Sequence, residues 1–264
     1  MSLKIEHKAE EGLTQIVGPG GGQLRLLSFS LLLLSQGHGF EFARLGEERV
    51  LLLMRGQCHA RVGGERFGPL ARSNLFKERA TAVYVPPDSP CYVEADLETE
   101  IAVVSAPAEI GSQPRVVLPA DVIVRRVGAS NWFREVHDIV GFRISAQKLL
   151  VGETFNPPGN WSSFPPHKHE RNDPPQESSH EEIYHFRLNP PSGFGLQLIY
   201  TDDREVDEPI VVRDADTVVI PRGYHPVVAA PGYSLYYLWA LAGESRQLFT
   251  REDPAHSWVR GNRA

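Results

Sequence analysis

The stretch GNWSSFPPHKHERNDPPQESSHEE, residues 159–182, decides the fold of this chain. His167 and His169 are two residues apart, so on an extended strand both imidazole rings leave the same face. After a polar, proline-bearing excursion, Glu182 begins the segment EIYHF, which the pattern predicts to be the next strand. The stretch therefore places two imidazoles and a carboxylate on strands or at strand ends.

A second segment, PRGYH at residues 221–225, supplies a third imidazole. It follows the apolar strand expected at Thr217–Ile220, and Gly223 favours a tight turn that brings His225 into the interior. Buried without partners, these groups would cost on the order of several kcal/mol, and a metal ion would remove that cost. Imidazoles and a carboxylate are typical ligands of a transition metal. We therefore expect one divalent ion with four ligands: His167, His169, Glu182 and His225.

Length and composition favour a soluble protein made of many short strands. The chain has 264 residues, and its 23 glycines and 21 prolines are spread without a repeat, as turn residues are. A net charge of −6 argues against a nucleic-acid surface. The most apolar run, Leu24–Leu34, is too short to span a bilayer, and the charged amino terminus lacks the apolar core of a secretory signal. We expect a cytoplasmic protein without membrane partners, with Cys58 and Cys91 as free thiols.

Apolar segments bounded by glycine, proline or charged residues predict a long series of strands. They include Leu24–Leu34, Arg49–Met54, Cys58–Val62, Leu75–Phe76, Ala82–Val85, Ile101–Ser105, Gln147–Phe155, Gly195–Tyr200, Thr217–Ile220 and Leu235–Ala240. Such a series is typical of a sandwich or barrel. One helix is expected, at Asn131–Val140, because its apolar residues would form a single helical face.

The order of strands and turns is similar in the two halves of the chain. We interpret residues 106–122, which contain three prolines, as a linker, with domains at residues 1–110 and 111–264. The segments YVPPDSPCYV (84–93) and VIPRGYHPVV (219–228) occupy similar places, which indicates an ancient duplication. Where the second copy has His225, the first has only Ser89 or Pro90. We therefore expect the first domain to bind no metal.

Both motifs resemble those of the cupin superfamily of small β-barrels. Its first motif is a glycine, a His-x-His pair, a spacer and a glutamate, and its second is Pro-x-Gly-x-x-His. Here the spacer before Glu182 is longer than usual, and His225 comes one residue early. The resemblance selects Glu182 over Glu181 as the ligand, because it directly precedes the apolar residue, and adjacent strand residues face opposite ways. By the same alternation Lys168, between the two histidines, is expected to be a structural or surface charge.

Longer strings resemble a narrower group, the 5-deoxy-glucuronate isomerase family of bacterial myo-inositol catabolism. They are GETFNPPGNWSSFPPHKH (152–169), EEIYHFRLNPPSGFG (181–195) and PRGYHPVVAAPGYSLYYLWALAG (221–243). The resemblance implies an all-β fold of two cupin-type barrels (a bicupin, or double-stranded β-helix) with few short helices. It also implies one divalent metal in the second barrel. Zinc is the metal we expect, and manganese, iron or nickel also suit these ligands.

The resemblance further implies an intramolecular oxidoreductase that converts 5-deoxy-glucuronate into 5-dehydro-2-deoxy-gluconate. The metal would polarise the carbonyl of the open-chain sugar acid while a base moves a proton from C2 to C1. His185 and Tyr200 are candidates for that base, with Gln197 as a hydrogen-bonding positioner. Arg143 or Arg187 would pair with the substrate carboxylate.

Two other functions are compatible with the same residues. One is a metal-dependent cupin dioxygenase that uses redox-active iron, and the other is a non-catalytic sugar-binding bicupin. The loop at residues 170–179 is either a lid over the barrel mouth or a disordered excursion. Whether the chain forms a homo-oligomer stays open.

Overall fold

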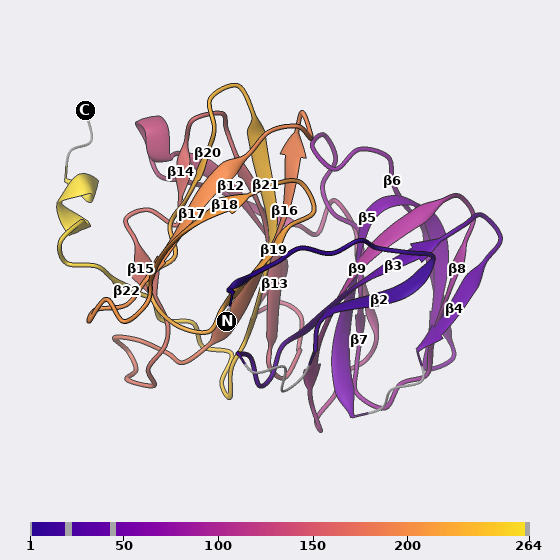
Figure 1. The fold of residues 1–264 in the computed structure, drawn as a ribbon. Coiled ribbons are helices and arrows are strands. Elements are labelled where there is room, and N and C mark those ends of the chain that lie inside the picture. Colours follow the sequence, from indigo (N-terminus) through magenta and orange to yellow (C-terminus); the bar gives the residue numbers. More distant parts are fainter. Residues whose placement is uncertain (1, 19–22, 43–45, 262–264) are drawn as a thin grey trace. The chain divides into compact units, whose positions relative to one another are not determined.

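The structure, a computed structural model, describes residues 2–18, 23–42 and 46–261 (Figure 1). Within these residues the chain is built from strands, and its helices are two short 3-10 turns, η1 (Ser130–Trp132) and η2 (Ser257–Arg260). The expected all-β class with few short helices is therefore confirmed. No helix in the described part of the chain is long and apolar enough to cross a membrane.

Two local expectations are wrong. The helix expected at Asn131–Val140 is the turn η1 followed by the strand β12 (Arg134–Val140). Its β-branched valines and isoleucine suit a pleated strand, and pairing inside a sheet outweighs a short helical period. The strand expected at Leu75–Phe76 is a turn instead.

The chain divides into two compact units. One, called here the amino-terminal unit, comprises His7–Ile123 and His137–Gly152. The other, the carboxy-terminal unit, comprises Met1–Glu6, Val124–Val136 and Glu153–Ala264. Each unit thus includes a short segment from the other half of the sequence, whereas the sequence analysis expected a single boundary near residue 110.

The amino-terminal unit contains a nine-stranded sheet in which β5 pairs with β6, β7, β8 and β9. Its strands are β2 (Gly12–Val17), β3 (Ser28–Leu34), β4 (Gly39–Phe42), β5 (Glu47–Val62), β6 (Glu65–Arg72), β7 (Ala82–Val85), β8 (Cys91–Ala95), β9 (Thr99–Pro107) and β10 (Arg115–Val117). Alternate residues of these strands face one interior, and they form a single cluster of buried apolar side chains. This apolar cluster forms the centre of the described core of the unit, and charged side chains such as Arg72 and Glu48 are buried elsewhere in it.

The carboxy-terminal unit contains sheets of seven, four and two strands. Figure 1 draws several of these strands in orange and yellow. The seven-stranded sheet has the order β1 (Lys4–Ile5), β19 (Thr217–Ile220), β16 (Glu181–Asn189), β21 (Ser234–Ala242), β13 (Leu149–Asn156), β12, β11 (Ile123–Val127). The boundary between the units falls within β11, β12 and β13. The smaller sheets are β14 (Trp161–Ser162), β20 (Val227–Ala229), β17 (Gly195–Tyr200) and β18 (Asp207–Val212), and β15 (His167–Lys168) with β22 (Arg251–Glu252).

Two hydrogen bonds join the seven-stranded sheet to the segment that begins at β14. The hydroxyl of Ser162 bonds that of Tyr237 on β21, and Oγ of Ser163 lies 2.9 Å from Oη of Tyr184 on β16. All four side chains are buried and line one cavity. Hydrogen-bonded hydroxyl groups thus lie in the interior of this unit, beside the cavity.

Candidate active site

Three of the four predicted metal ligands converge inside the carboxy-terminal unit. His169 directly follows β15, Glu182 lies in β16, and His225 comes just before β20. Nε2 of His169 and Nε2 of His225 lie 3.2 Å and 3.3 Å from the same oxygen, Oε2 of Glu182. The three donor atoms all lie within 4.8 Å of one another, and the three side chains are buried. Residues from distant segments thus meet at one point.

Backbone carbonyls set the orientation of the two imidazoles. Nδ1 of His169 lies 2.9 Å from the carbonyl oxygen of His180, and Nδ1 of His225 lies 3.0 Å from that of Gly223. A carbonyl only accepts, so each Nδ1 carries the hydrogen and donates it. In His225 this leaves the Nε2 lone pair directed at a carboxylate oxygen, which is itself an acceptor, whereas Nε2 of His169 shares a hydrogen bond with that oxygen. Such a second-sphere carbonyl is the usual support of a metal-binding histidine.

The electrostatics at this point favour a cation. Burial lowers the pKa of His225 to about 3, so its ring is neutral, and its Nε2 makes no hydrogen bond to the described residues. Burial also opposes a charge on His169, but the hydrogen bond and charge of Glu182 outweigh it and raise the pKa of His169. One proton can therefore satisfy the pair of His169 and Glu182, but only a divalent cation would satisfy all three groups. The donors present fit a transition metal.

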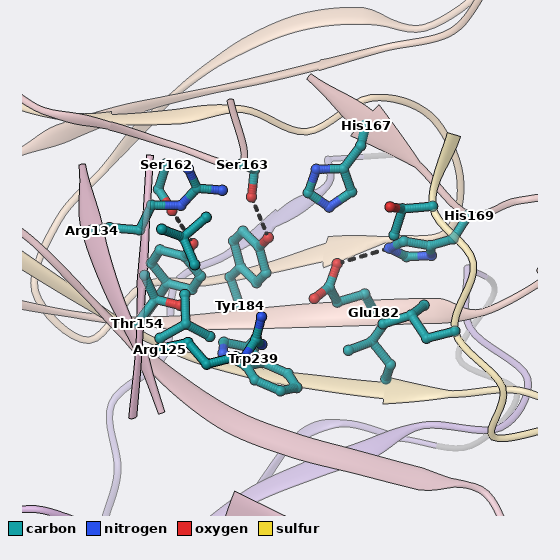
Figure 2. A pocket seen from close by; sticks show the side chains of 16 residues that line it. Arg125, Arg134, Thr154, Ser162, Ser163, His167, His169, Glu182, Tyr184 and Trp239 are labelled. Carbon is teal, nitrogen blue, oxygen red and sulfur yellow. Dashed lines mark hydrogen bonds and ion pairs between the residues drawn. The ribbon is translucent and has the colours of Figure 1, made fainter. Parts of the chain in front are cut away.

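His167 borders this trio without belonging to it. Its ring centroid lies 4.8 Å from that of His225 and 6.3 Å from that of His169. Burial lowers the pKa of His167 to about 3, so it presents a neutral imidazole. Figure 2 shows His167 on the same side of the cavity as Glu182 and His169. Its assignment as the fourth ligand stays a prediction.

A buried lysine ties the histidine-bearing strand to the turn before His225. Nζ of Lys168 lies 2.7 Å from Oε1 of Glu170 and also pairs with Asp202. Oε2 of Glu170 in turn accepts a hydrogen bond of 3.0 Å from the backbone nitrogen of Gly223. Lys168 is 1% exposed. Of the two roles expected for it, the structural charge is therefore the one that the structure has.

Gly223 is required where it stands. Its φ is +92°, and a Cβ at this position would lie 2.6 Å from the carbonyl oxygen of Tyr200. Tyr200 and Tyr224 exchange backbone hydrogen bonds of 2.8 and 3.0 Å, and their rings stack with centroids 5.0 Å apart. The hydroxyl of Tyr200 donates to Asp253 at 2.7 Å. In this structure Tyr200 supports the turn that carries His225, and it does not line the cavity.

A cavity of about 210 Å³ opens beside the converging donors (Figure 2). His167, His169 and Glu182 lie at one end of it, and Arg134 lies at the other. The remaining lining side chains are Arg125, Val127, Val136, Thr154, Ser162, Ser163, Tyr184, Tyr237, Trp239, Leu241, Leu248 and Thr250. Hydroxyl, aromatic and cationic groups thus surround a space far larger than one ion needs.

Tyr184 occupies the middle of the cavity in Figure 2. Its ring stacks on that of Tyr237 with centroids 4.2 Å apart, and its hydroxyl bonds that of Ser163. Burial and the nearby charge of Glu182 raise the pKa of Tyr184 well above its ordinary value. The phenol is therefore protonated at neutral pH and able to donate a hydrogen bond.

The other predicted site residues lie away from this cavity. His185 and Arg187 alternate with Glu182 and Tyr184 along β16, so they are on the opposite face of the strand. Nδ1 of His185 lies 3.0 Å from Oγ1 of Thr217, and Nη1 of Arg187 lies 3.5 Å from a carboxylate oxygen of Asp214.

Gln197 and Arg143 are also outside the lining. Gln197 is fully buried, and its side-chain amide makes no hydrogen bond to the described residues. Arg143 lines a different cavity, of about 120 Å³, in the amino-terminal unit. The positions of these four residues and of Tyr200 test no role in the reaction, so all five assignments stay predictions.

Tyr184 and Arg134 are among the cavity residues that sequence reasoning did not assign to the site. Tyr184 is two residues after Glu182 on a predicted strand, so alternation alone could have placed it beside this predicted ligand. Arg134 lies in the segment that was expected to be helical, where strand alternation was not applied.

The loop at residues 170–179 is held by its own hydrogen bonds. Oε1 of Glu177 accepts from the backbone nitrogens of Glu170 and Arg171 at 2.7 and 3.0 Å. The hydroxyl of Ser178 bonds the backbone of Phe249. The loop is thus ordered, and the expectation of a disordered excursion is wrong. Its action as a lid stays a prediction.

The comparison with known families agrees with the donor set. The model of the KduI/IolB family matches residues 3–259. The chain belongs to this family. A relative from Geobacillus thermodenitrificans, named 5-deoxy-glucuronate isomerase, is 39% identical over 252 residues, which are 95% of this chain and 92% of the relative. The resemblance seen in the sequence strings is therefore confirmed.

Solved structures support the family and the fold. An IolB-like protein from Salmonella typhimurium LT2 superposes with a TM-score of 0.94 at 33% identity, covering 98% of this chain and 100% of that one. The oxalate decarboxylase of Lactobacillus farciminis, solved with formate, has a TM-score of 0.70 at 11% identity and covers 96% and 88% of the two chains. This second likeness concerns the fold alone. With the family, it confirms the expected cupin-type fold.

Proposed function

We propose that this protein is an aldose–ketose isomerase that converts 5-deoxy-glucuronate into 5-dehydro-2-deoxy-gluconate in myo-inositol catabolism. The name of its relatives supports the reaction, and family membership extends over nearly the whole chain. The observation that carries the proposal is the convergence of His169, Glu182 and His225, two of which line one end of the cavity. An enzyme of this kind acts on a small molecule. We expect it to be cytoplasmic and to bind neither nucleic acid nor membrane.

The reaction is internally balanced. The hydrogen on C2 leaves as a proton, a proton arrives at C1, and the hydroxyl proton of O2 is exchanged for one on O1. No external oxidant or reductant is needed, so the site must supply only positive charge near the two oxygens and groups that hold or move protons.

We assign the ion to His169, Glu182 and His225, with the adjacent His167 as the fourth ligand. Zinc is the metal we expect, and manganese, iron or nickel would suit the same donors. When bound, a divalent cation supplies Lewis-acid polarisation of the substrate carbonyl. The carbonyl groups of His180 and Gly223 keep two of the imidazoles in the tautomer that this role needs.

The protein's own groups supply the rest of the chemistry. Tyr184 holds its proton and faces the cavity, so it can donate a hydrogen bond to a substrate oxygen beside the ligands. Trp239 and Tyr237 give the cavity aromatic walls that exclude water from the reacting carbons. Catalytic roles for His185, Tyr200 and Gln197 stay predictions, and the lining of the cavity favours Tyr184 over them.

The experiment is a proton NMR assay on 5-deoxy-glucuronate, run without oxygen. The protein is stripped with a chelator and then reloaded separately with zinc, manganese, iron or nickel. We expect conversion only after reloading, with one metal ion per chain by elemental analysis. Oxygen consumption in an aerated sample would indicate a dioxygenase instead. Tight binding of the sugar acid without conversion under any metal would show a non-catalytic binding protein.

A further inference from the structure

Arg134 is a buried cation without an acidic partner in the described part of the chain. It is 8% exposed, and its recorded hydrogen bonds run from Nη1 to the backbone carbonyls of Trp132 and Phe164, at 3.3 and 3.2 Å. No ion pair to a described carboxylate is formed. Burial lowers the pKa of Arg134, and the neighbouring cations Arg125 and Arg260 act in the same direction. A buried charge in such surroundings is costly unless an anion binds it.

The hydrogen bonds that Arg134 already makes leave one edge of its guanidinium available. The two carbonyls account for the two hydrogens of Nη1, and a guanidinium has five N–H donors. Nε and Nη2 therefore keep three hydrogens, and two of them, one on each nitrogen, point out along the same planar edge. This edge matches the two oxygens of a carboxylate, which an arginine binds in a bidentate way.

The position of this arginine within the cavity is what links it to a substrate. Arg134 lines the same cavity as His167, His169 and Glu182, and Figure 2 shows it across Tyr184 from them. Arg125, on β11, lines the cavity as well. A linear sugar acid has its carbonyl at one end and its carboxylate at the other. It would thus meet the ion-binding end and the arginine end together.

We propose that Arg134 binds the carboxylate of the sugar-acid substrate and so selects acids over neutral sugars. This inference rests on the proposed isomerase function for the identity of the substrate. The carboxylate accepts from Nε and Nη2, while the carbonyls of Trp132 and Phe164 hold the guanidinium in place. Arg125 adds positive charge at the same end of the cavity.

The test compares two substrates in two matched variants. The substrates are 5-deoxy-glucuronate and its neutral counterpart 5-deoxy-glucose, in which a hydroxymethyl group replaces the carboxylate. The variants are Arg134→Met and, as the control, Arg126→Met on β11, whose side chain is 77% exposed and pairs with Glu135 at 3.6 Å. We expect Arg134→Met to lower kcat/KM for the acid on the order of 100-fold. The value for the neutral sugar should change little, and the control should resemble the wild type.

Equal losses for both substrates would show a merely structural role and overturn the proposal, as would no loss at all. Circular dichroism and thermal melting report whether Arg134→Met folds. If it does not fold, Arg134→Lys is tested instead, because lysine keeps the positive charge but cannot bind a carboxylate through two parallel hydrogen bonds. An acid-selective loss of about tenfold in that variant supports the proposal. Wild-type selectivity in it overturns the bidentate assignment.

A separate arm distinguishes failure of this inference from failure of the proposed function. Calorimetry measures binding of glucuronate and of glucose to the metal-loaded protein, without any turnover. If the wild type isomerises neither substrate, the isomerase function is wrong. If the wild type nevertheless binds glucuronate and Arg134→Met does not, a carboxylate site is still supported. Equal glucuronate binding in both proteins, or none in the wild type, would overturn it.

Discussion

The two compact units are both built of strands, but a cluster of apolar side chains fills the centre of one, and a cavity beside titratable side chains lies in the other. In the amino-terminal unit the cluster at the centre contains leucine, valine, isoleucine, alanine, phenylalanine and cysteine side chains. In the carboxy-terminal unit the corresponding space holds buried histidines, a glutamate, tyrosines and an arginine around a cavity of about 210 Å³. The cavity recorded among the apolar side chains of the first unit measures about 10 Å³. A close-packed apolar interior stabilises the fold, whereas a cavity that exposes buried titratable groups leaves room for a ligand.

The turns before β8 of the amino-terminal unit and β20 of the carboxy-terminal unit illustrate the same difference. The first reads PPDSPCYV and the second PRGYHPVV, so a histidine is present in only one of them. Cys91, which follows the first turn, is buried against apolar neighbours. His225, in the second, faces Glu182. Binding of a single metal ion per chain, in the carboxy-terminal unit, stays our prediction.

Replacing His225 should have the largest effect of the changes considered. His225→Ala removes one of three converging donors, and we expect loss of bound metal and a fall in kcat on the order of 1,000-fold or more. The fold should persist, because the strands around the site keep their apolar contacts. Elemental analysis, the NMR assay and far-UV circular dichroism measure the three effects.

His38→Ala is the matched control, since His38 is exposed and lies in the amino-terminal unit. It should keep one metal ion per chain and full activity. An unfolded His225→Ala protein would indicate a structural ion whose binding energy is folding energy. Two metal ions per wild-type chain would contradict the difference between the units.

A substitution in the apolar unit should act on stability alone. Leu53 on β5 is 3% exposed and belongs to the apolar cluster. Leu53→Ala should lower the free energy of unfolding by about 2–5 kcal/mol, through lost transfer energy and a new cavity. Below the melting temperature, kcat and metal content should match the wild type. A large drop in kcat in a folded variant would show that the units are functionally coupled.

Removal of the buried lysine should weaken the metal site without destroying it. Lys168→Met deletes the charge that holds Glu170 and Asp202 beside the histidine-bearing strand. We expect metal affinity to fall about 10- to 100-fold, the range typical of residues that orient metal ligands. Competition with a coloured chelator measures it. Lys77→Met, at an exposed position in the amino-terminal unit, serves as the control. Unchanged affinity in Lys168→Met would mean that the turn of His225 is held by other contacts.

The smallest expected effect concerns the two thiols of the apolar unit. Burial raises the pKa of Cys58 and of Cys91 to about 12, from a value near 9. Both are then protonated in the folded protein at pH 8, and a thiol reagent should label them only after denaturation. Because the folded pKa is raised, their contribution to stability is intact below about pH 9 and declines as the pH rises toward 12. Rapid labelling of the native protein would show that this interior opens easily.

Much of the fold was accessible from local pattern. Alternating apolar residues between glycine and proline turns predicted β7, β17 and β19 with their observed bounds, and β3 and β16 to within a few residues. The pattern failed at β12, where an apolar period compatible with a helix was satisfied by pairing inside a sheet. Local propensity carries little weight when a segment can gain a full ladder of hydrogen bonds from its neighbours.

The sequence by itself determined the strand-rich class, the family resemblance and the candidate ligands, because spacing along a strand fixes which side chains share a face. His169 and Glu182 met as that spacing and the family motifs indicated. Only the tertiary structure decided which polar residues surround the cavity. It set His185 and Arg187 on the far face of β16, and it brought in Arg134 from a segment misread as a helix. The physical reason is that burial and the lack of a counter-charge are properties of packed neighbours, which no local stretch of sequence contains.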